Sequence, residues 1–161
     1  KEIFDTSKKV SVITAEDTRY FHCNIKTLNL IPNVMAAEKA SAAGCFETVF
    51  HRNGRVTECS HSNVHIIKDG VFKTAPTDNL ILPGITRRHI IDACKRNGIS
   101  VAENPFSLGE LFEADEIIIT SSSVFGASVN MADGKEVGGK APELGELLKK
   151  ELMDEFVKET N

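Results

Sequence analysis

A single lysine stands inside a neutral, half-apolar run near the start of this sequence. The run is His22–Leu30, and Lys26 lies at its centre. A charged ammonium fits poorly among apolar neighbours unless it has an ionic partner or has been converted into another group. A lysine in a strand more commonly keeps its amine in water at a sheet edge. Lys26 is therefore a candidate for amine chemistry, and a solvated lysine is the competing interpretation.

Two further stretches carry polar groups that could work with such an amine. Gly54–Asn63 reads Gly-Arg-Val-Thr-Glu-Cys-Ser-His-Ser-Asn and contains Glu58, and Asn79–Arg87 reads Asn-Leu-Ile-Leu-Pro-Gly-Ile-Thr-Arg. A glutamate in a hairpin strand is by itself usually a solvated residue. With the three stretches in this order, however, the sequence resembles the class IV (fold type IV) pyridoxal-phosphate aminotransferases. The resemblance runs from about Thr14 to about Lys140.

The resemblance implies roles for four residues around the ring of pyridoxal 5'-phosphate. Lys26 matches the family lysine that holds the cofactor as a Schiff base and then moves a proton, which suits an amine nucleophile. Glu58 matches the glutamate that pairs with the pyridine nitrogen, because a carboxylate stabilises the protonated ring. Leu82 matches a leucine that packs on one face of the ring, and Arg19 matches an arginine expected close to Glu58.

Four other residues are implied in binding the cofactor phosphate. Ile85 and Thr86 stand where a loop enters a predicted helix, and first-turn N–H groups with the helix dipole suit a phosphate. An ordinary helix cap is the competing interpretation. Ser121 and Ser122 follow a predicted buried strand, where family members offer hydroxyl and amide donors. No metal site is predicted, because the four cysteines form no Cys-x-x-Cys pair.

The reaction that the resemblance implies is ping-pong transamination between an amino acid and a 2-oxo acid. The Leu82–Arg87 run and the Ser-x-Ser-Asn segment are most similar to the D-amino-acid aminotransferase branch, with D-alanine as an example of a substrate. Branched-chain L-amino-acid aminotransferases and 4-amino-4-deoxychorismate lyase share the lysine and the glutamate, so both stay open. A non-catalytic, β-rich interaction domain that keeps Lys26 and Glu58 from its ancestry is a further alternative, and it predicts no cofactor binding.

The sequence departs from the family pattern in two respects. His61 stands where close relatives carry a small serine, and His22 stands at a position that can be basic, so a bulkier ring could alter substrate fit. The resemblance also covers only the larger, cofactor-binding domain, while the small N-terminal domain carries the substrate-recognition residues. We therefore expect residues 1–161 to be a single domain that is not a competent aminotransferase by itself. The family implies a homodimer for the intact protein.

The composition narrows the remaining possibilities. The chain has 161 residues, 41% of them hydrophobic, which suits one domain with a buried core. Its formal charge of -4 comes from interleaved residues without a basic block, so nothing indicates nucleic acid or an anionic membrane as a partner. The scattered cysteines favour a reduced, cytoplasmic setting. No apolar run reaches the roughly 20 residues of a transmembrane helix. The start Lys1–Asp5 resembles neither a signal peptide nor a natural beginning, which suggests an excised domain.

The elements that must position these residues begin with a strand and a helix on either side of Lys26. Val10–Thr14 alternates and is β-branched, which predicts a strand, and Arg19–Cys23 could extend the same sheet so that Lys26 follows its end. Pro32 begins a helix that Gly44 ends. Two hairpins with Asn-Gly and Asp-Gly turns then predict an antiparallel, meandering sheet; their strands are Phe46–Phe50, Arg55–Cys59, Asn63–Ile67 and Val71–Thr74.

The second half of the sequence alternates between helices and strands. Thr86 is predicted to cap a helix that runs to about Asn97. The elements predicted after it are a strand at Ser100–Glu103, a short helix with a capping box at Ser107–Glu110, strands at Glu116–Thr120 and Ala127–Met131, and an amphipathic helix from Pro142. The sum is an α+β fold rather than a doubly wound one. The resemblance implies a mixed, hairpin-rich antiparallel β pseudo-barrel flanked by helices.

Overall fold

A computed structural model describes residues 9–160, so the charged start Lys1–Asp5 lies outside the described residues. The strands are β1 (Lys9–Glu16), β2 (Glu47–Arg52), β3 (Arg55–Cys59), β4 (Asn63–Lys68), β5 (Val71–Thr74), β6 (Ser100–Ala102), β7 (Glu116–Thr120), β8 (Ala127–Ala132) and β9 (Lys135–Glu136). They form one sheet in the order β3-β2-β1-β8-β7-β4-β5-β6, and β9 pairs with β8.

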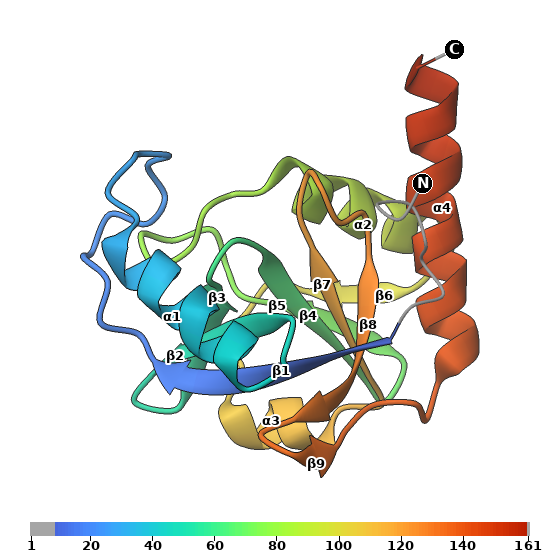
Figure 1. The fold of residues 1–161 in the computed structure, drawn as a ribbon. Helices are drawn as coiled ribbons and strands as arrows, with labels where there is room; N and C mark the ends of the chain where they lie inside the picture. The colour runs from blue at the N-terminus through green and yellow to red at the C-terminus, as the bar shows by residue number, and fades with distance from the viewer. Residues whose placement is uncertain (1–8, 161) are drawn as a thin grey trace.

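The sheet is mixed and curls into part of a barrel (Figure 1). β1 runs parallel to both β2 and β8, and β5 runs parallel to β6. The other pairs of neighbouring strands are antiparallel, including the predicted hairpins β2–β3 and β4–β5. The tight turn of the first hairpin contains Asn53 and Gly54, both with positive φ, as its sequence predicts. The predicted mixed pseudo-barrel with hairpins is therefore confirmed.

The predicted meander is wrong, because the two hairpins do not lie side by side in the sheet. β1, β8 and β7 stand between them. β4 is buried along almost its whole length, and a strand buried on both faces belongs inside a covered sheet. The chain crosses from β3 to β4 through Ser60–Ser62, where the Cys59 N–H donates to the Ser62 carbonyl at 2.7 Å. This crossing brings the end of β3 and the start of β4 together without pairing the strands.

Hydrophobic cores fill both faces of the sheet around β4 and β7. Ile66, Ile117 and Ile119 point into the curl of the sheet, where they join valines of β1, β2 and β3. Ile67 and Ile118 point outward and pack against two helices, α2 (Ile85–Arg96) and α4 (Pro142–Thr160). Because alternate residues of a strand face opposite sides, two cores require the nearly continuous apolar runs seen in these strands.

Helices α1, α2 and α4 lie against the outside of the curled sheet, and α3 lies at one end of it, where Leu111 joins the inner core (Figure 1). α1 (Ile31–Ala42) has Pro32 in its first turn and is followed by Gly44 with a φ of +68°, as predicted. α3 (Leu108–Glu113) begins with the predicted capping box between Ser107 and Glu110. Within the described range, no helix is both long and apolar enough to cross a membrane.

Two local predictions are wrong. Arg19–Cys23 does not extend a strand, because β1 ends at Glu16 and the chain then follows an irregular path to α1. The segment is held by the ion pairs of the Arg19 side chain with Asp17 and Glu58 rather than by hydrogen bonds to a neighbouring strand. Thr86 does not cap α2, since the cap position is Gly84 and no side chain accepts a hydrogen bond there. Thr86 lies inside the first turn and is buried.

Candidate active site

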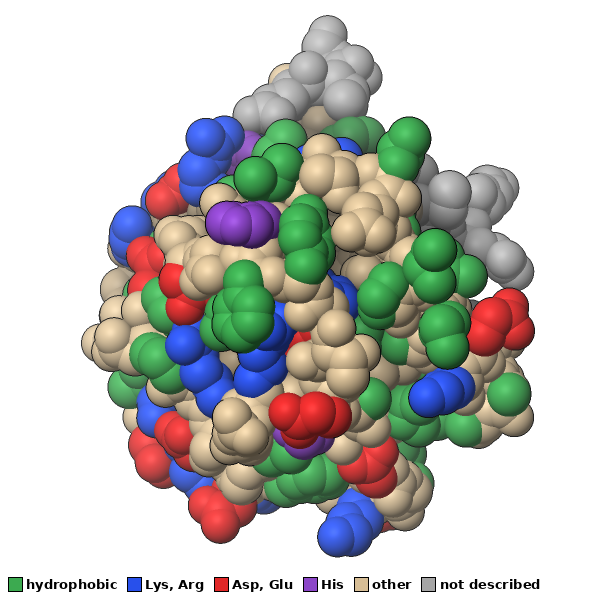
Figure 2. Space-filling model, turned by 90° about the vertical axis from the view of Figure 1, so that its left-hand side faces the viewer, with side chains coloured by type: hydrophobic (Ala, Val, Ile, Leu, Met, Phe, Trp, Pro, Cys, Tyr) green, Lys and Arg blue, Asp and Glu red, His purple; other side chains and the backbone are tan. Residues whose placement is uncertain are grey.

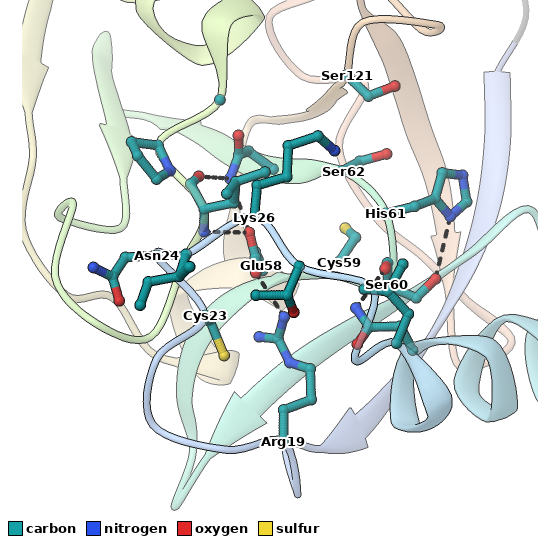
Figure 3. Close-up of a pocket in the computed structure, with 18 of the residues that line it drawn as sticks. Arg19, Cys23, Asn24, Lys26, Glu58, Cys59, Ser60, His61, Ser62 and Ser121 are labelled. Atoms are coloured by element: carbon teal, nitrogen blue, oxygen red, sulfur yellow. Dashed lines mark hydrogen bonds and ion pairs between the residues drawn. The ribbon is translucent and has the colours of Figure 1, made fainter.

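One pocket of about 550 Å³ lies at the open end of the curled sheet, and all eight residues predicted for the site line it. They come from separate parts of the chain and are Arg19, Lys26, Glu58, Leu82, Ile85, Thr86, Ser121 and Ser122. The size is within the range of pockets that hold a cofactor or a drug-sized ligand. Figure 3 shows several of these side chains around the pocket.

Lys26 enters the pocket from the irregular segment between β1 and α1. The segment is fixed to the loop before α2, because the Cys23 N–H donates to the Asn79 carbonyl at 2.9 Å and Asn79 Nδ2 donates to the Phe21 carbonyl at 2.7 Å. Lys26 itself is exposed. Within residues 9–160 its amine has no ion pair or hydrogen bond, which leaves the nitrogen lone pair available for reaction once the amine is deprotonated.

Glu58 is a buried carboxylate at the base of the same pocket. Its Oε1 accepts from Arg19 Nη1 at 2.6 Å, and its Oε2 accepts from the Leu82 N–H at 2.9 Å. Burial raises the pKa of Glu58 to about 7, although the Arg19 guanidinium and the Leu82 N–H pull it down. A carboxyl with such a pKa can hold a proton or share it with a basic nitrogen placed against it.

Arg19 lies behind Glu58 and joins it to a second buried carboxylate, Asp17. Figure 3 shows the guanidinium pointing toward Glu58. Asp17 accepts from Arg19 Nε and Nη2, each at 2.9 Å, and from Arg52 Nε at 3.2 Å. Burial raises the pKa of Asp17, but the hydrogen bonds and charge of Arg19 outweigh it and leave the pKa lowered. The network therefore holds Arg19 rigidly as a cation beneath the pocket.

Asn63, at the start of β4, fixes the loop that carries Leu82. Its Nδ2 donates to the Leu82 carbonyl at 3.0 Å and to Glu58 Oε2 at 3.2 Å. Its Oδ1 lies so close to Gly84 that a Cβ at that position would overlap with it. Gly84 is thus required by the close approach of this loop to β4, and the approach sets Leu82 and α2 relative to Glu58.

The first turn of α2 and the turn after β7 supply neutral donors on the other side of the pocket. No side chain caps α2, so its first-turn N–H groups lack a side-chain acceptor. Ile85 is 69% exposed, whereas Thr86 is buried. Ser121 is partly engaged in its own turn, where its Oγ accepts from the Val124 N–H at 3.1 Å. An uncapped helix N-terminus with nearby hydroxyls is suited to an anion.

These groups fit pyridoxal 5'-phosphate by their chemistry. The pocket offers an unpaired amine at Lys26, a buried carboxylate at Glu58 and an uncapped helix N-terminus at Ile85. Those match the aldehyde, ring nitrogen and phosphate of the cofactor, respectively. The roles of the eight residues stay predictions, and the structure brings all eight to the same pocket.

Sequence reasoning missed three buried polar residues that shape the site. Asp17 and Asn63 hold Arg19 and Leu82, and Glu47 at the start of β2 pairs with His61 Nδ1 at 2.9 Å. Asn63 closes the quoted Ser-His-Ser-Asn run, and Asp17 is the acidic residue nearest Arg19 in the sequence. Glu47 gave no local signal, because its partners Ser60 and His61 lie on the far side of a hairpin.

Comparison with known proteins places these residues in context. The family model described as "Amino-transferase class IV" matches residues 4–130. Among curated proteins, the D-alanine aminotransferase of Listeria innocua serovar 6a is 46% identical over 149 residues, which cover 92% of this chain and 52% of that protein. The chain therefore spans about half the length of this relative.

Solved structures show the same fold. A fold IV-transaminase from Curtobacterium pusillum aligns with a TM-score of 0.81 and 25% identity, over 92% of this chain and 55% of that one. The branched-chain amino acid aminotransferase of Escherichia coli aligns with a TM-score of 0.76 and 27% identity, over 86% of this chain and 48% of that one. In both structures the match again covers about half of the solved chain.

Proposed function

Because the chain belongs to the class IV aminotransferase family, we propose that it forms the cofactor-binding part of an enzyme that moves an amino group between an amino acid and a 2-oxo acid. One observation carries the proposal: an unpaired lysine amine and a buried glutamate, predicted from separate motifs, line one pocket. The proposed cofactor is pyridoxal 5'-phosphate, whose donor and acceptor groups match those of the pocket.

When bound, pyridoxal phosphate supplies an electron-withdrawing ring that stabilises negative charge on a substrate carbon. Lys26 would hold the cofactor covalently until the substrate amine replaces it. The freed Lys26 amine would then take the proton from the substrate Cα and deliver it to a carbon of the cofactor. Glu58 would keep a proton on the ring nitrogen, because Arg19 and the Leu82 N–H hold the carboxylate in place. Leu82 would press on one face of the ring, and the first turn of α2 would bind the phosphate.

We infer that the substrate is a D-amino acid such as D-alanine. The support is the 46% identity with a D-alanine aminotransferase, against 27% with a branched-chain amino acid aminotransferase. The branched-chain L-amino acids remain the second candidate, because a protein of that activity shares the fold. A screen of the full-length protein with D-alanine and L-leucine as amino donors separates the two. Activity with D-alanine supports our inference, and activity confined to L-leucine overturns it.

We also propose that the face around the pocket is covered in the intact enzyme. Apolar side chains gather there (Figure 2), on the segment before α1 and on α1 itself. Leu28 is 97% exposed, Ile31 is 70% exposed and Phe21 is 63% exposed. Exposed apolar patches of this kind mark interfaces. The relatives' remaining half and a second subunit of a homodimer are the proposed occupants.

Borohydride trapping of the cofactor tests the central assignment. Full-length protein is mixed with pyridoxal phosphate, reduced with borohydride and digested, and the modified peptide is identified by mass spectrometry. We expect the modification at Lys26 and its loss in Lys26→Ala. The exposed Lys39 of α1 provides a control, since Lys39→Ala should leave the modification intact. Scattered labelling, or none at Lys26, refutes the proposal.

A further inference from the structure

His61 and Glu47 form a charged pair at the edge of the pocket that the proposed reaction does not use. Glu47 is fully buried at the start of β2, and its Oε2 lies 2.9 Å from His61 Nδ1. His61 lines the pocket with half of its side chain exposed. Figure 3 shows its ring at the edge of the pocket, with a dashed line toward Ser60, and Ser62 also lines the pocket.

The hydrogen bonds around Glu47 stabilise its ionised form. Its Oε1 accepts from the Thr48 N–H at 3.1 Å, from the Ser60 N–H at 3.2 Å and from the Ser60 hydroxyl, and its Oε2 accepts from the Ser62 hydroxyl at 3.1 Å. These bonds and the His61 pair outweigh burial and lower the pKa of Glu47. A buried carboxylate needs a cation, and within residues 9–160 His61 is its ion-pair partner.

The pair fixes which nitrogen of His61 is free. Nδ1 faces Glu47 and also lies 3.3 Å from Ser60 Oγ, so it carries a proton that it donates. Nε2 has no hydrogen-bond partner among residues 9–160. Glu47 raises the pKa of His61, against a smaller lowering by burial. When the ring is protonated, Nε2–H becomes a charged donor at the pocket.

We propose that His61 is an anion-recognition residue of the pocket, whose Nε2–H binds an oxygen of a phosphate or carboxylate group. The proposal deepens the proposed function, because the cofactor carries a phosphate and the substrates carry carboxylates. The Phe46 ring lies beside the His61 ring, with centroids 6.3 Å apart. The charged and titratable groups around His61 are Glu47 on β2, and Lys26 and Glu58 across the pocket.

Anion titration of the full-length protein tests this inference without the cofactor. Histidine side chains are labelled with 15N, and the His61 resonances are assigned by their loss in His61→Asn. Inorganic phosphate and succinate are then titrated at a series of pH values from about pH 5 upward, so that binding is followed from the charged ring at low pH to the neutral ring at high pH. We expect saturable shifts at low pH and affinity about tenfold weaker at high pH, as for a lost charge-assisted bond. Absence of a saturable shift with either anion overturns the proposal.

His89→Asn is the matched control, because His89 Nδ1 pairs with Glu155 at 3.0 Å in the same manner but away from the pocket. It should change neither titration. Glu47→Gln tests the positioning role, since removal of the carboxylate charge should lower the pKa of His61 and weaken anion binding at about pH 7. Because Glu47→Gln could disturb the fold, the half-exposed His61→Asn carries the test alone if that variant does not fold.

A second arm identifies the source of the anion. If His61→Asn weakens pyridoxal phosphate about tenfold but leaves pyridoxal unchanged, the partner is the phosphate. If it instead raises the KM for 2-oxoglutarate and leaves that for pyruvate, the partner is a substrate carboxylate. Unchanged values for all four compounds overturn the proposal. If the proposed function is wrong, borohydride trapping will not label Lys26. The anion titration does not depend on that result, so it still tests whether His61 binds an anion.

Discussion

Removal of the Arg19 guanidinium should destabilise the chain more than removal of an exposed arginine. In Arg19→Met, Glu58 loses its ion-pair partner, and Asp17 keeps Arg52 as its ion-pair partner among residues 9–160, together with the hydrogen bond from the Thr57 hydroxyl. The side chains of Arg19, Glu58 and Asp17 are 6%, 7% and 0% exposed, so water replaces the lost partner only poorly. A buried pair broken on one side costs about 3–5 kcal/mol, and the lost contact of Arg19 with the Phe50 ring adds to this.

The matched control is Arg55→Met, which removes a half-buried ion pair with Asp78. Those side chains are 31% and 32% exposed, and pairs screened by solvent contribute less than about 1 kcal/mol. Urea unfolding followed by circular dichroism should therefore show a midpoint shift several times larger for Arg19→Met than for Arg55→Met.

The pH dependence of this loss identifies Glu58 as its main source. Burial raises the pKa of Glu58 to about 7, so ionising this carboxyl costs free energy in the folded state. The resulting loss of stability is absent below the unfolded pKa of roughly 4.3 and is complete above about pH 7. Removal of Arg19 enlarges the penalty. The destabilisation by Arg19→Met should thus be larger at about pH 8 than at about pH 5.

A double-mutant cycle then decides whether the two side chains act together. Glu58→Gln removes the charge that Arg19→Met leaves unpaired, so the double variant should be more stable at about pH 8 than the sum of single effects predicts, by about 2 kcal/mol. Additive effects, or an Arg19→Met loss no larger than that of Arg55→Met, would refute the coupling of Arg19 to Glu58.

Three further outcomes follow from the structure. His65 is fully buried between Thr74 Oγ1 and Thr120 Oγ1, and burial lowers its pKa to about 3, so as the pH falls the unfolded chain binds a proton before the folded chain does. The contribution of His65 to the free energy of unfolding should therefore fall by about 3 kcal/mol from pH 7 to pH 4, opposite in sign to that of Glu58, and His65→Gln should remove this fall relative to the unsubstituted protein in urea titrations. Gly84→Ala should displace Asn63 and weaken pyridoxal phosphate binding measured by absorbance, whereas Gly109→Ala, whose Cβ would lie 3.6 Å from Ser107 Oγ, should leave binding unchanged. The chain alone should show no transamination of D-alanine in a coupled assay, and addition of the relatives' other half should be required for activity.

Local patterns predicted the elements of the fold well, because each depends on neighbours in the sequence. The Asn53-Gly54 turn, the Ser107–Glu110 capping box and the Pro32 helix start follow from backbone preferences over a few residues. The order of the strands in the sheet could not be predicted from these local patterns. Whether β4 pairs with β3 or with β7 depends on which helices cover it, and those are encoded far along the chain.

The irregular path of Arg19–Cys23 shows why a strand pattern can mislead. It contains Tyr20 and Phe21, which are residue types common in strands, but the Arg19 side chain binds Asp17 and Glu58. The backbone carbonyl of Arg19 accepts from the Arg52 side chain at 2.8 Å, in place of a hydrogen bond to a neighbouring strand. Tertiary ion pairs therefore overrode the local preference for extended structure.

The site separates in the same way into residues that a sequence can reveal and residues that it cannot. Lys26 and Glu58 are visible because their motifs are short and lie on single segments. Glu47 pairs with His61, which lies beyond the next strand, and Asp17 binds Arg52 of β2 as well as the nearby Arg19. Each looks like an ordinary acidic residue in its own segment. Burial makes both carboxylates important for stability, because an ionised group that is removed from water needs hydrogen bonds or an opposite charge from the protein. The sequence indicates where the reacting groups lie, whereas the protonation of Glu58 and His61 depends on the partners that the fold brings to them.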